Sequence, residues 1–326
     1  MKIVVIGGAG FIGSQFVRDI VLGERPGFEH ADVTVYDRFT YAGSRANLGE
    51  ALQRCRVVEG DVCDQASLTD VLAGSDLVVN FAAETHVDRS ITDSHAFMRT
   101  NALGTQALMR ACLNTSVPRI VQVSTDEVYG SIERGRWTED QSISPNSPYA
   151  AAKASGDLIA LAYARTHGLP VSITRCGNNY GPFQYPEKLV PLFITHLLEG
   201  KRVPLYGDGK NVREWVHTAD HCAGIRLVAL AGEPGAVYNI SGSVELSNTE
   251  IVDRLLELLG ATWDRVEFVA DRQGHDFRYA LDDSRIRSLG YTPEVDFDKG
   301  LADTVRWYRE NPDWWGPRKL EPQGGE

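Results

Sequence analysis

Short apolar runs alternate with longer amphipathic stretches through the first half of the chain. The runs are too short for helices and too apolar for exposed edge strands, and they lie at 3–6, 33–36, 57–58, 77–81, 120–123 and 171–175. The helix-like stretches lie at 13–22, 67–73, 94–114 and 148–166. This alternation predicts strand-helix-strand units around a parallel sheet, and therefore an α/β fold of the doubly wound type.

The second half has a different character. Pro182, Pro186, Pro191 and Pro204 interrupt the rhythm, and the elements become irregular from about residue 177. The length of 326 residues also exceeds what one hydrophobic core usually serves. We therefore expect two domains, 1–176 with the parallel sheet and 177–326 as a mainly separate, smaller mixed α/β domain. A segment around 210–240 is expected to return to the first domain.

Composition narrows the range of partners. The chain carries 33 Lys plus Arg against 44 Asp plus Glu, a net charge of −11, which argues against nucleic acid and anionic membranes as partners. The five cysteines are scattered without disulfide or zinc spacing and predict free thiols. No stretch reaches the roughly 18 apolar residues of a membrane span, and no signal peptide is recognisable. These features predict a soluble, cytoplasmic protein.

A glycine-rich turn follows the first apolar run directly. Gly7, Gly10 and Gly13, with Phe11 and Ile12 between them, satisfy a dinucleotide-binding spacing and open a helix. Such glycines allow a tight turn, close approach of the backbone to a pyrophosphate and close packing of the helix on the strand. Asp37 ends the second run, near the spacing expected for a ribose-binding carboxylate, and disfavours a 2′-phosphate. These residues predict a site for NAD rather than NADP.

The segment after the third run has two readings. Asp61 and Val62 lie within Gly60–Asp64, which could contact the adenine or could provide a helix N-cap. The chemistry of the segment favours neither reading.

The candidate catalytic residues lie in two segments. Thr125, Asp126 and Glu127 follow the run 120–123, at the edge of the sheet where ligands of doubly wound folds bind. Tyr149 and Lys153 lie four residues apart on one face of the helix that starts near Pro148. A lysine ammonium and an oxidised nicotinamide nearby would favour the phenolate, which could then accept an alcohol proton. Taken alone, Asp126 and Glu127 could also be a solvated acidic turn. Tyr149 and Lys153 could also be an ordinary exposed pair on a helix.

Taken together, these motifs resemble the extended short-chain dehydrogenase/reductase family over nearly the whole length. The matching elements are the glycine-rich turn, Asn80 to Ala83, Asn101, Tyr149 and Lys153. The family implies a Rossmann-type NAD-binding domain and adds Ala82 to the residues that contact the cofactor. Within it, Ser124-Thr125-Asp126-Glu127-Val128-Tyr129-Gly130 resembles the dTDP-glucose 4,6-dehydratase subgroup, as do the stretches 37–43, 84–90, 178–182, 186–189 and 271–276.

The resemblance implies a reaction and roles for the residues. A lyase of this subgroup oxidises carbon-4 of dTDP-glucose, eliminates water across carbons 5 and 6, and returns the hydride to carbon-6. By analogy with the subgroup, Asp126 would be the acid at carbon-6 and Glu127 the base at carbon-5. Carboxyls so close should have separated pKa values, which makes this division physically reasonable. Thr125 would bond the carbon-4 oxygen and Lys153 would hold the nicotinamide ribose.

The resemblance also implies substrate-binding residues and a homodimer. The substrate residues are Thr125, His86, Asn179, Glu187, Lys188, Arg213, Asn239, Arg272 and His275. The dimer would form through the helices at 94–114 and 148–166. The histidines lack metal-ligand spacing, so we expect no metal site. Departures from the commonest subgroup pattern at 241–243 and Gln273 leave the choice between dTDP and UDP open. The rivals are a related UDP-sugar dehydratase, epimerase or decarboxylase, and an inactive NAD-sensing protein.

Overall fold

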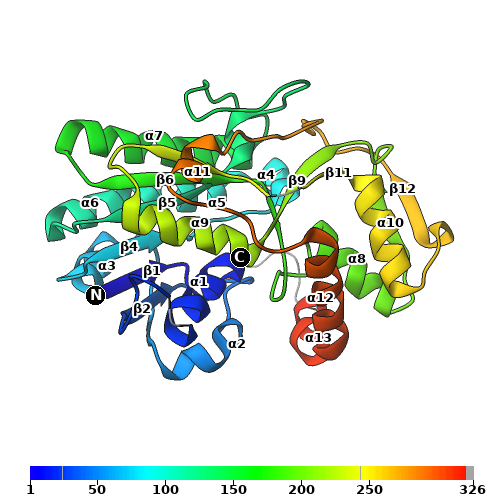
Figure 1. The fold of residues 1–326 in the computed structure, drawn as a ribbon, viewed down its shortest axis with the longest axis horizontal. Coiled ribbons are helices and arrows are strands. Elements are labelled where there is room, and N and C mark those ends of the chain that lie inside the picture. Colours follow the sequence, from blue (N-terminus) through cyan, green and yellow to red (C-terminus); the bar gives the residue numbers. More distant parts are fainter. Residues whose placement is uncertain (24, 243, 321–326) are drawn as a thin grey trace.

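A seven-stranded parallel sheet forms the centre of the protein, seen here in a computed structural model that describes residues 1–23, 25–242 and 244–320 (Figure 1). Its strands run in the order β10-β6-β5-β4-β1-β2-β3, and every neighbouring pair is parallel. Their bounds are β1 (Lys2–Ile6), β2 (Asp32–Asp37), β3 (Arg56–Glu59), β4 (Leu77–Asn80), β5 (Ile120–Thr125), β6 (Val171–Cys176) and β10 (Val237–Ile240). The order reverses beside β1, and ligands of such sheets bind at the carboxyl ends of the strands there.

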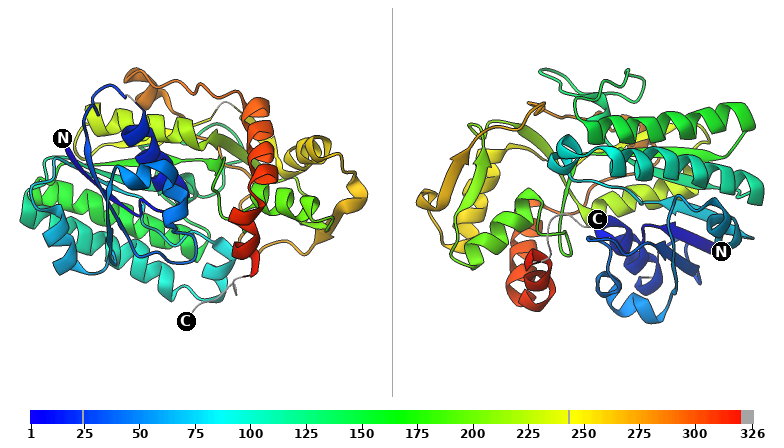
Figure 2. Two further views of the ribbon diagram at one scale, coloured as in Figure 1. Left: turned by 90° about the horizontal axis from the view of Figure 1, so that it is seen from below. Right: turned by 180° about the vertical axis from the view of Figure 1, so that it is seen from behind.

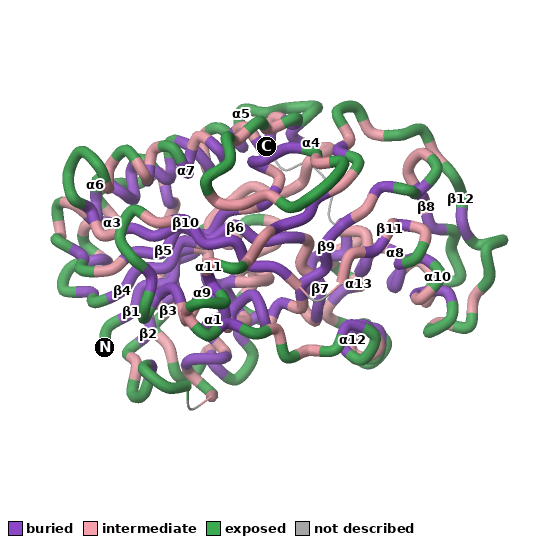
Figure 3. The backbone as a smooth tube through the Cα atoms, turned by 45° about the horizontal axis from the view of Figure 1, so that its top comes forward, coloured by how far each residue is buried: buried purple, intermediate pink, exposed green. Residues whose placement is uncertain are grey.

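Helices cover both faces of this sheet. Alternate side chains of β1 enter different cores: Ile3 and Val5 face one, whereas Val4 and Ile6 face the other. The first core is covered by α1 (Phe11–Leu22), α2 (Arg45–Leu48), η1 (Gly49–Gln53), α9 (Thr218–Ala231) and α11 (Ser284–Ser288). The second is covered by α3 (Gln65–Leu72), α6 (Thr105–Thr115) and α7 (Pro148–His167). The strands are accordingly the most continuously buried part of the chain (Figure 3).

The predicted α/β class and Rossmann-type sheet are confirmed, and each of the six apolar runs forms a strand. The expected helix at 94–114 is less regular than its pattern indicates: it consists of α5 (His95–Phe97), a π-helical turn η2 (Met98–Gly104) and α6. Within η2, the Asn101 side chain exchanges two hydrogen bonds with the backbone of Glu84, while the backbone carbonyl of Asn101 accepts from the Thr105 hydroxyl. The widened turn thus anchors the loop that follows β4.

A second group of elements lies beyond one end of the sheet (Figures 1 and 2). Its strands are β7 (Asn178–Tyr180), β9 (Val212–His217) and β11 (Val244–Ser247) in one sheet, and β8 (Val203–Tyr206) with β12 (Val266–Val269) in another. Its helices α8 (Leu189–Leu198), α10 (Asn248–Leu259), α12 (Phe297–Glu310) and α13 (Pro312–Leu320) pack around a third core, whereas the short helix η4 (Trp263–Arg265) has no buried residue. β10 joins the main sheet from this half of the chain, while the division into domains at residue 176 stays a prediction.

Candidate active site

A cavity of about 660 Å³ lies at the carboxyl ends of the sheet strands, where the second group of elements faces them. Both halves of the chain line it. All the predicted site residues except Asn239 line this cavity: Gly7, Gly10, Phe11, Ile12, Gly13, Asp37, Asp61, Val62, Ala82, His86, Thr125, Asp126, Glu127, Tyr149, Lys153, Asn179, Glu187, Lys188, Arg213, Arg272 and His275. The topology therefore brings together residues separated by more than half of the chain.

The glycine-rich turn has the shape of an anion cradle. A Cβ on Gly7, whose φ is +71°, would lie 2.5 Å from the Ala82 nitrogen, and one on Gly13 would lie 2.3 Å from the Gly7 oxygen. At Gly10 only the Gly7 oxygen lies within 4 Å, so a side chain there would enter the cavity. Among the described residues, no side chain caps the start of α1 at Gly10, and the first residues of this helix line the cavity. The first N–H groups of a helix have no partner within the helix and are available to a ligand. These features fit the pyrophosphate of a dinucleotide.

Asp37 connects the end of β2 to this turn. Its carboxylate accepts hydrogen bonds from the backbone nitrogens of Ala9 at 2.9 Å and Phe39 at 2.8 Å. Burial raises its pKa, although these two bonds oppose the rise. Since each carboxylate oxygen has a second lone pair, Asp37 can also accept ribose hydroxyls from the cavity.

The two readings of the segment 60–64 apply to different residues. Asp64 caps α3 by accepting from the nitrogens of Ala66 and Ser67, both at 3.1 Å. Asp61 instead lines the cavity and pairs with Arg99 at 2.7 Å.

Two carboxyl groups of different character follow β5, in the short helix η3 (Asp126–Tyr129). Asp126 is buried; one oxygen accepts from the Thr125 hydroxyl at 3.1 Å, and the other has no partner among the described residues. Burial, followed by the charge of Glu127, raises the pKa of Asp126 well above its ordinary value. Burial also raises the pKa of Glu127, but Lys188, Arg213 and Arg272 oppose this rise. Asp126 is thus suited to hold a proton and Glu127 to carry the charge.

Tyr149 lies in the first turn of α7, whose N-cap Ser147 accepts from the Ala150 nitrogen. Burial and the charge of Glu127 raise the Tyr149 pKa well above its ordinary value, and a hydrogen bond with Thr125 opposes the rise. The protein groups alone therefore favour the neutral phenol, and the phenolate expected beside an oxidised nicotinamide stays a prediction.

Lys153 faces the same region one turn later. Its Nζ donates to the Val123 carbonyl at 2.7 Å, and burial lowers its pKa to about 8 against the attraction of Asp157. Asp157 itself forms a buried ion pair with Arg175 at 2.9 Å. The ammonium is thereby fixed beside the end of β5.

Charged residues from the second half of the chain line the cavity wall that faces the sheet. Glu187 pairs with Arg89 at 2.6 Å and accepts from the Tyr41 hydroxyl at 3.0 Å, while the Lys188 ammonium donates to the Thr85 carbonyl at 2.6 Å. These bonds join the segment after β4 to the segment before α8 across the cavity.

Three further predicted residues have their positions fixed by neighbours. The Arg213 guanidinium donates to the Asp276 carbonyl at 2.8 Å and lies over the Tyr279 ring at 4.4 Å. The Asn179 amide donates to the Gly177 carbonyl at 3.0 Å. The His275 ring lies 2.7 Å from a carboxylate oxygen of Asp271.

His86 caps the helix α4 (Val87–Thr92), accepting from the Arg89 nitrogen at 3.4 Å. Burial and Lys188 lower its pKa to about 4, so the ring is neutral near pH 7. Its contacts give it a structural role at the cavity wall in addition to the predicted contact with substrate.

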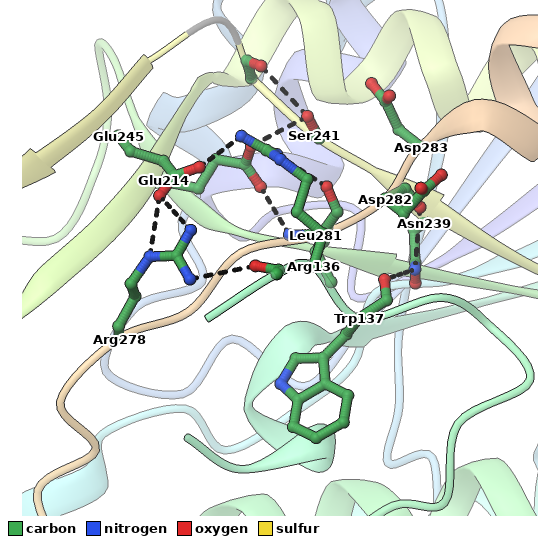
Figure 4. Close-up of polar contacts among 12 residues, drawn as sticks. Arg136, Trp137, Glu214, Asn239, Ser241, Glu245, Arg278, Leu281, Asp282 and Asp283 are labelled. Carbon is green, nitrogen blue, oxygen red and sulfur yellow. Dashed lines mark hydrogen bonds and ion pairs between the residues drawn. The ribbon is translucent and has the colours of Figure 1, made fainter. Parts of the chain in front are cut away.

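The prediction for Asn239 is wrong. This residue is fully buried in β10 and does not line the cavity. Its amide nitrogen donates to the carbonyls of Trp137 and Asp282 (Figure 4). Its amide oxygen accepts from the Tyr129 hydroxyl. The amide therefore joins the loops that contain Trp137 and Asp282 to strand β10. A polar residue at the end of a strand resembled a ligand contact in the sequence, but the sequence does not reveal that these loops cover it.

Several residues of the cavity wall were missed. Tyr41, Asp88, Tyr206, Asp276 and Tyr279 all line the cavity. Asp88 lies in the short helix α4, and the others lie in loops or at strand ends, where no hydrophobic period marks their direction. The stretches 37–43, 84–90 and 271–276 carried the resemblance to the family and were the available signal for three of them.

No group of three or more His, Cys, Asp and Glu side chains in the described part of the chain could hold a metal ion. Across the described ranges, no helix is long and apolar enough to cross a membrane.

Known proteins resemble this chain over nearly its whole length. A family model described as GDP-mannose 4,6 dehydratase matches residues 4–304. The dTDP-glucose 4,6-dehydratase of Streptomyces niveus is 55% identical over 322 residues, which cover 98% of this chain and 96% of the relative. The chain belongs to the dTDP-glucose 4,6-dehydratase family.

Solved structures of dehydratases and epimerases are also similar. The dTDP-glucose 4,6-dehydratase DesIV of Streptomyces venezuelae, crystallised with NAD, superimposes with a TM-score of 0.96 at 57% identity, covering 98% of this chain and all of that one. A UDP-glucose 4-epimerase of Thermus thermophilus, also with NAD, has a TM-score of 0.87 at 29% identity, covering 95% of this chain and all of that one. The dehydratase family and the epimerases thus share the fold.

Proposed function

We propose that this chain is a dTDP-glucose 4,6-dehydratase, a hydro-lyase that converts dTDP-glucose to dTDP-4-keto-6-deoxyglucose. The observation that carries the proposal is the pair Asp126 and Glu127, held beside Thr125 and Tyr149 in the cavity that also contains the glycine-rich turn. Oxidation alone needs a base such as Tyr149. Elimination of water additionally needs one acid and one base. The pKa of Asp126 is raised further than that of Glu127, which three cations oppose, so Asp126 is the better suited of the two to hold the proton.

The residues of the first half fit NAD. The cradle at Gly10, the uncapped start of α1 and the spare acceptor capacity of Asp37 are the features that support this fit. When bound, NAD supplies a hydride acceptor for carbon-4 and the same hydride for carbon-6. We assign Lys153 to the nicotinamide ribose, and Val62 and Ala82 to the cofactor wall.

We assign the proton transfers to four side chains. Tyr149 accepts the proton of the carbon-4 hydroxyl, and Thr125 donates a hydrogen bond to the resulting carbonyl oxygen. Glu127 removes the carbon-5 proton, which the carbon-4 ketone acidifies. Asp126 delivers its proton to the carbon-6 hydroxyl, which leaves as water. The unpartnered oxygen of Asp126 supports this role, since it provides a position for the transferable proton.

The opposite wall is assigned to the substrate. Arg213 and Arg272 are suited to the diphosphate because a guanidinium can donate two parallel bonds to it. Glu187, Lys188 and Asn179 are assigned to the sugar. These cations give an acidic protein a local site for an anionic ligand.

We further propose a homodimer in the cytoplasm. Leu103 and Leu158 are 62% and 56% exposed, on η2 and α7, which pack against each other. Burying them against a second copy would contribute about 1.5–3 kcal/mol for each side chain. All five cysteines are free thiols, which fits a reducing compartment.

The choice of nucleotide is tested by incubating the protein separately with dTDP-glucose and UDP-glucose and following the 4-keto product. We expect efficient conversion of dTDP-glucose only. Conversion of UDP-glucose to a 4-epimer, or no turnover with either substrate, would contradict the proposed function.

A further inference from the structure

The short helix α4 connects three parts of the cavity through consecutive residues. It lies between the sheet and the second group of elements (Figure 1). The side chains of residues 88–90 contact, in order, Arg272 on the substrate wall, Glu187 before α8, and the backbone nitrogen of Tyr149. Asp88, Arg89 and Ser90 themselves take no part in the proposed chemistry.

The contact between Asp88 and Arg272 fixes the orientation of the guanidinium. Asp88 accepts from Arg272 Nε at 2.6 Å and from Nη2 at 2.8 Å, so the carboxylate occupies one edge of the fork. Nη1 has no hydrogen bond to any described residue. The guanidinium also lies over the Tyr206 ring, 5.2 Å from its centre, and the Tyr206 hydroxyl lies 3.5 Å from Asp88. Asp88, Tyr206 and Arg272 all line the cavity.

We propose that Asp88 is a positioning residue that holds the Arg272 guanidinium with its free edge toward the substrate diphosphate. An arginine on a loop loses much rotamer freedom when it binds a phosphate. Asp88 has already removed that freedom in the protein without substrate. Ser90 on the same helix accepts from the Tyr149 nitrogen at 3.1 Å. Helix α4 therefore contacts both the arginine assigned to the diphosphate and the tyrosine assigned to the reacting sugar. This inference rests on the proposed function.

Asp88 could instead compete with the diphosphate for Arg272, and this role predicts the opposite change in affinity when Asp88 is removed. A carboxylate at the cavity wall could occupy Arg272 in place of the diphosphate and repel that ligand. Removing Asp88 would then tighten binding. The two roles therefore differ in the sign of the change in affinity.

The experiment measures dTDP binding to the NAD-loaded protein by calorimetry, and KM and kcat for dTDP-glucose, in Asp88→Ala and Asp88→Asn variants. We expect Asp88→Ala to raise the dTDP Kd and the KM by about fivefold to tenfold, the cost of ordering one long side chain. We expect a smaller rise in Asp88→Asn, whose amide oxygen can still accept from Nε. The kcat should change less than twofold, because no reacting atom touches Asp88.

A matched control is Asp298→Ala. Asp298 also accepts from an arginine Nε, that of Arg254 at 3.0 Å, and neither residue lines the cavity. It should leave the Kd and KM unchanged.

Equal or tighter dTDP binding by Asp88→Ala would overturn the inference. So would a loss of kcat and thermal stability with the Kd unchanged, since that indicates a merely structural role. If the unaltered protein binds dTDP but does not convert dTDP-glucose, the proposed function fails instead, and the effect of Asp88 on dTDP affinity still tests the positioning of Arg272.

Discussion

Replacing Glu127 with glutamine should separate the oxidation step from the elimination step. The substitution keeps the shape of the side chain but removes its negative charge and its ability to accept the carbon-5 proton. A general base contributes about 10²–10⁴ in rate, which corresponds to about 2.7–5.4 kcal/mol of barrier. We therefore expect 4-keto-6-deoxy product to form at least about 100-fold more slowly.

The oxidation step should respond differently. The charge of Glu127 raises the pKa of Tyr149, so its removal makes the phenolate easier to form. The rate of oxidation, which needs the phenolate, should consequently reach its half-maximal value at a lower pH than in the unaltered enzyme. Binding should not weaken, because Lys188, Arg213 and Arg272 lose a negative neighbour and keep their charges for the diphosphate.

The assay is stopped-flow absorbance of reduced nicotinamide after the variant is mixed with dTDP-glucose, followed by quenching and product analysis. Reduced cofactor should accumulate and persist. Product formation at the unaltered rate would refute the role of Glu127 as the base. Loss of both reduced cofactor and substrate binding would show that the side chain has a structural role instead.

Three other substitutions test the cradle, the core and the dimer. Gly13→Ala places a Cβ 2.3 Å from the Gly7 oxygen, at a cost of about 1–3 kcal/mol, and should lower the NAD content of the purified protein. The control is Gly316→Ala, whose Cβ would meet no described atom within 4 Å outside its own helix backbone and chain neighbours. Equal NAD content in both variants would contradict the fit of the glycine-rich turn to NAD. Asp157→Ala leaves a buried guanidinium unpaired and should lower the free energy of unfolding in urea by about 3–5 kcal/mol; an unchanged midpoint would exclude that contribution. Leu158→Glu should convert dimers to monomers in sedimentation, and the idea fails if the unaltered protein is already monomeric.

The sequence was most informative where burial and backbone geometry act locally. The apolar runs predicted the strands because both faces of the sheet are covered, so every side chain of β4 is buried. Gly7 and Gly13 could be identified because no side chain fits at their positions. The acids after β5 could be placed because a parallel sheet brings its strand ends to one edge.

The rest depends on which distant segments meet. The buried state of Asn239 depends on loops contributed by Trp137 and Asp282, far from it in the chain. The contact between Asp88 and Arg272 joins residues 184 positions apart, and no period in either segment indicates it. The environment of Tyr149 could not be read either, because its pKa depends on burial and on the orientation of Glu127.

The central claim is that one hydride leaves carbon-4 and returns to carbon-6 of the same sugar while Glu127 and Asp126 remove water. The most direct test is turnover of dTDP-glucose carrying deuterium at carbon-4, followed by NMR or mass spectrometry of the product. We expect the deuterium at carbon-6 of the product and a solvent hydrogen at carbon-5. Deuterium retained at carbon-4 of an epimerised sugar, or lost to exogenous cofactor, would contradict it.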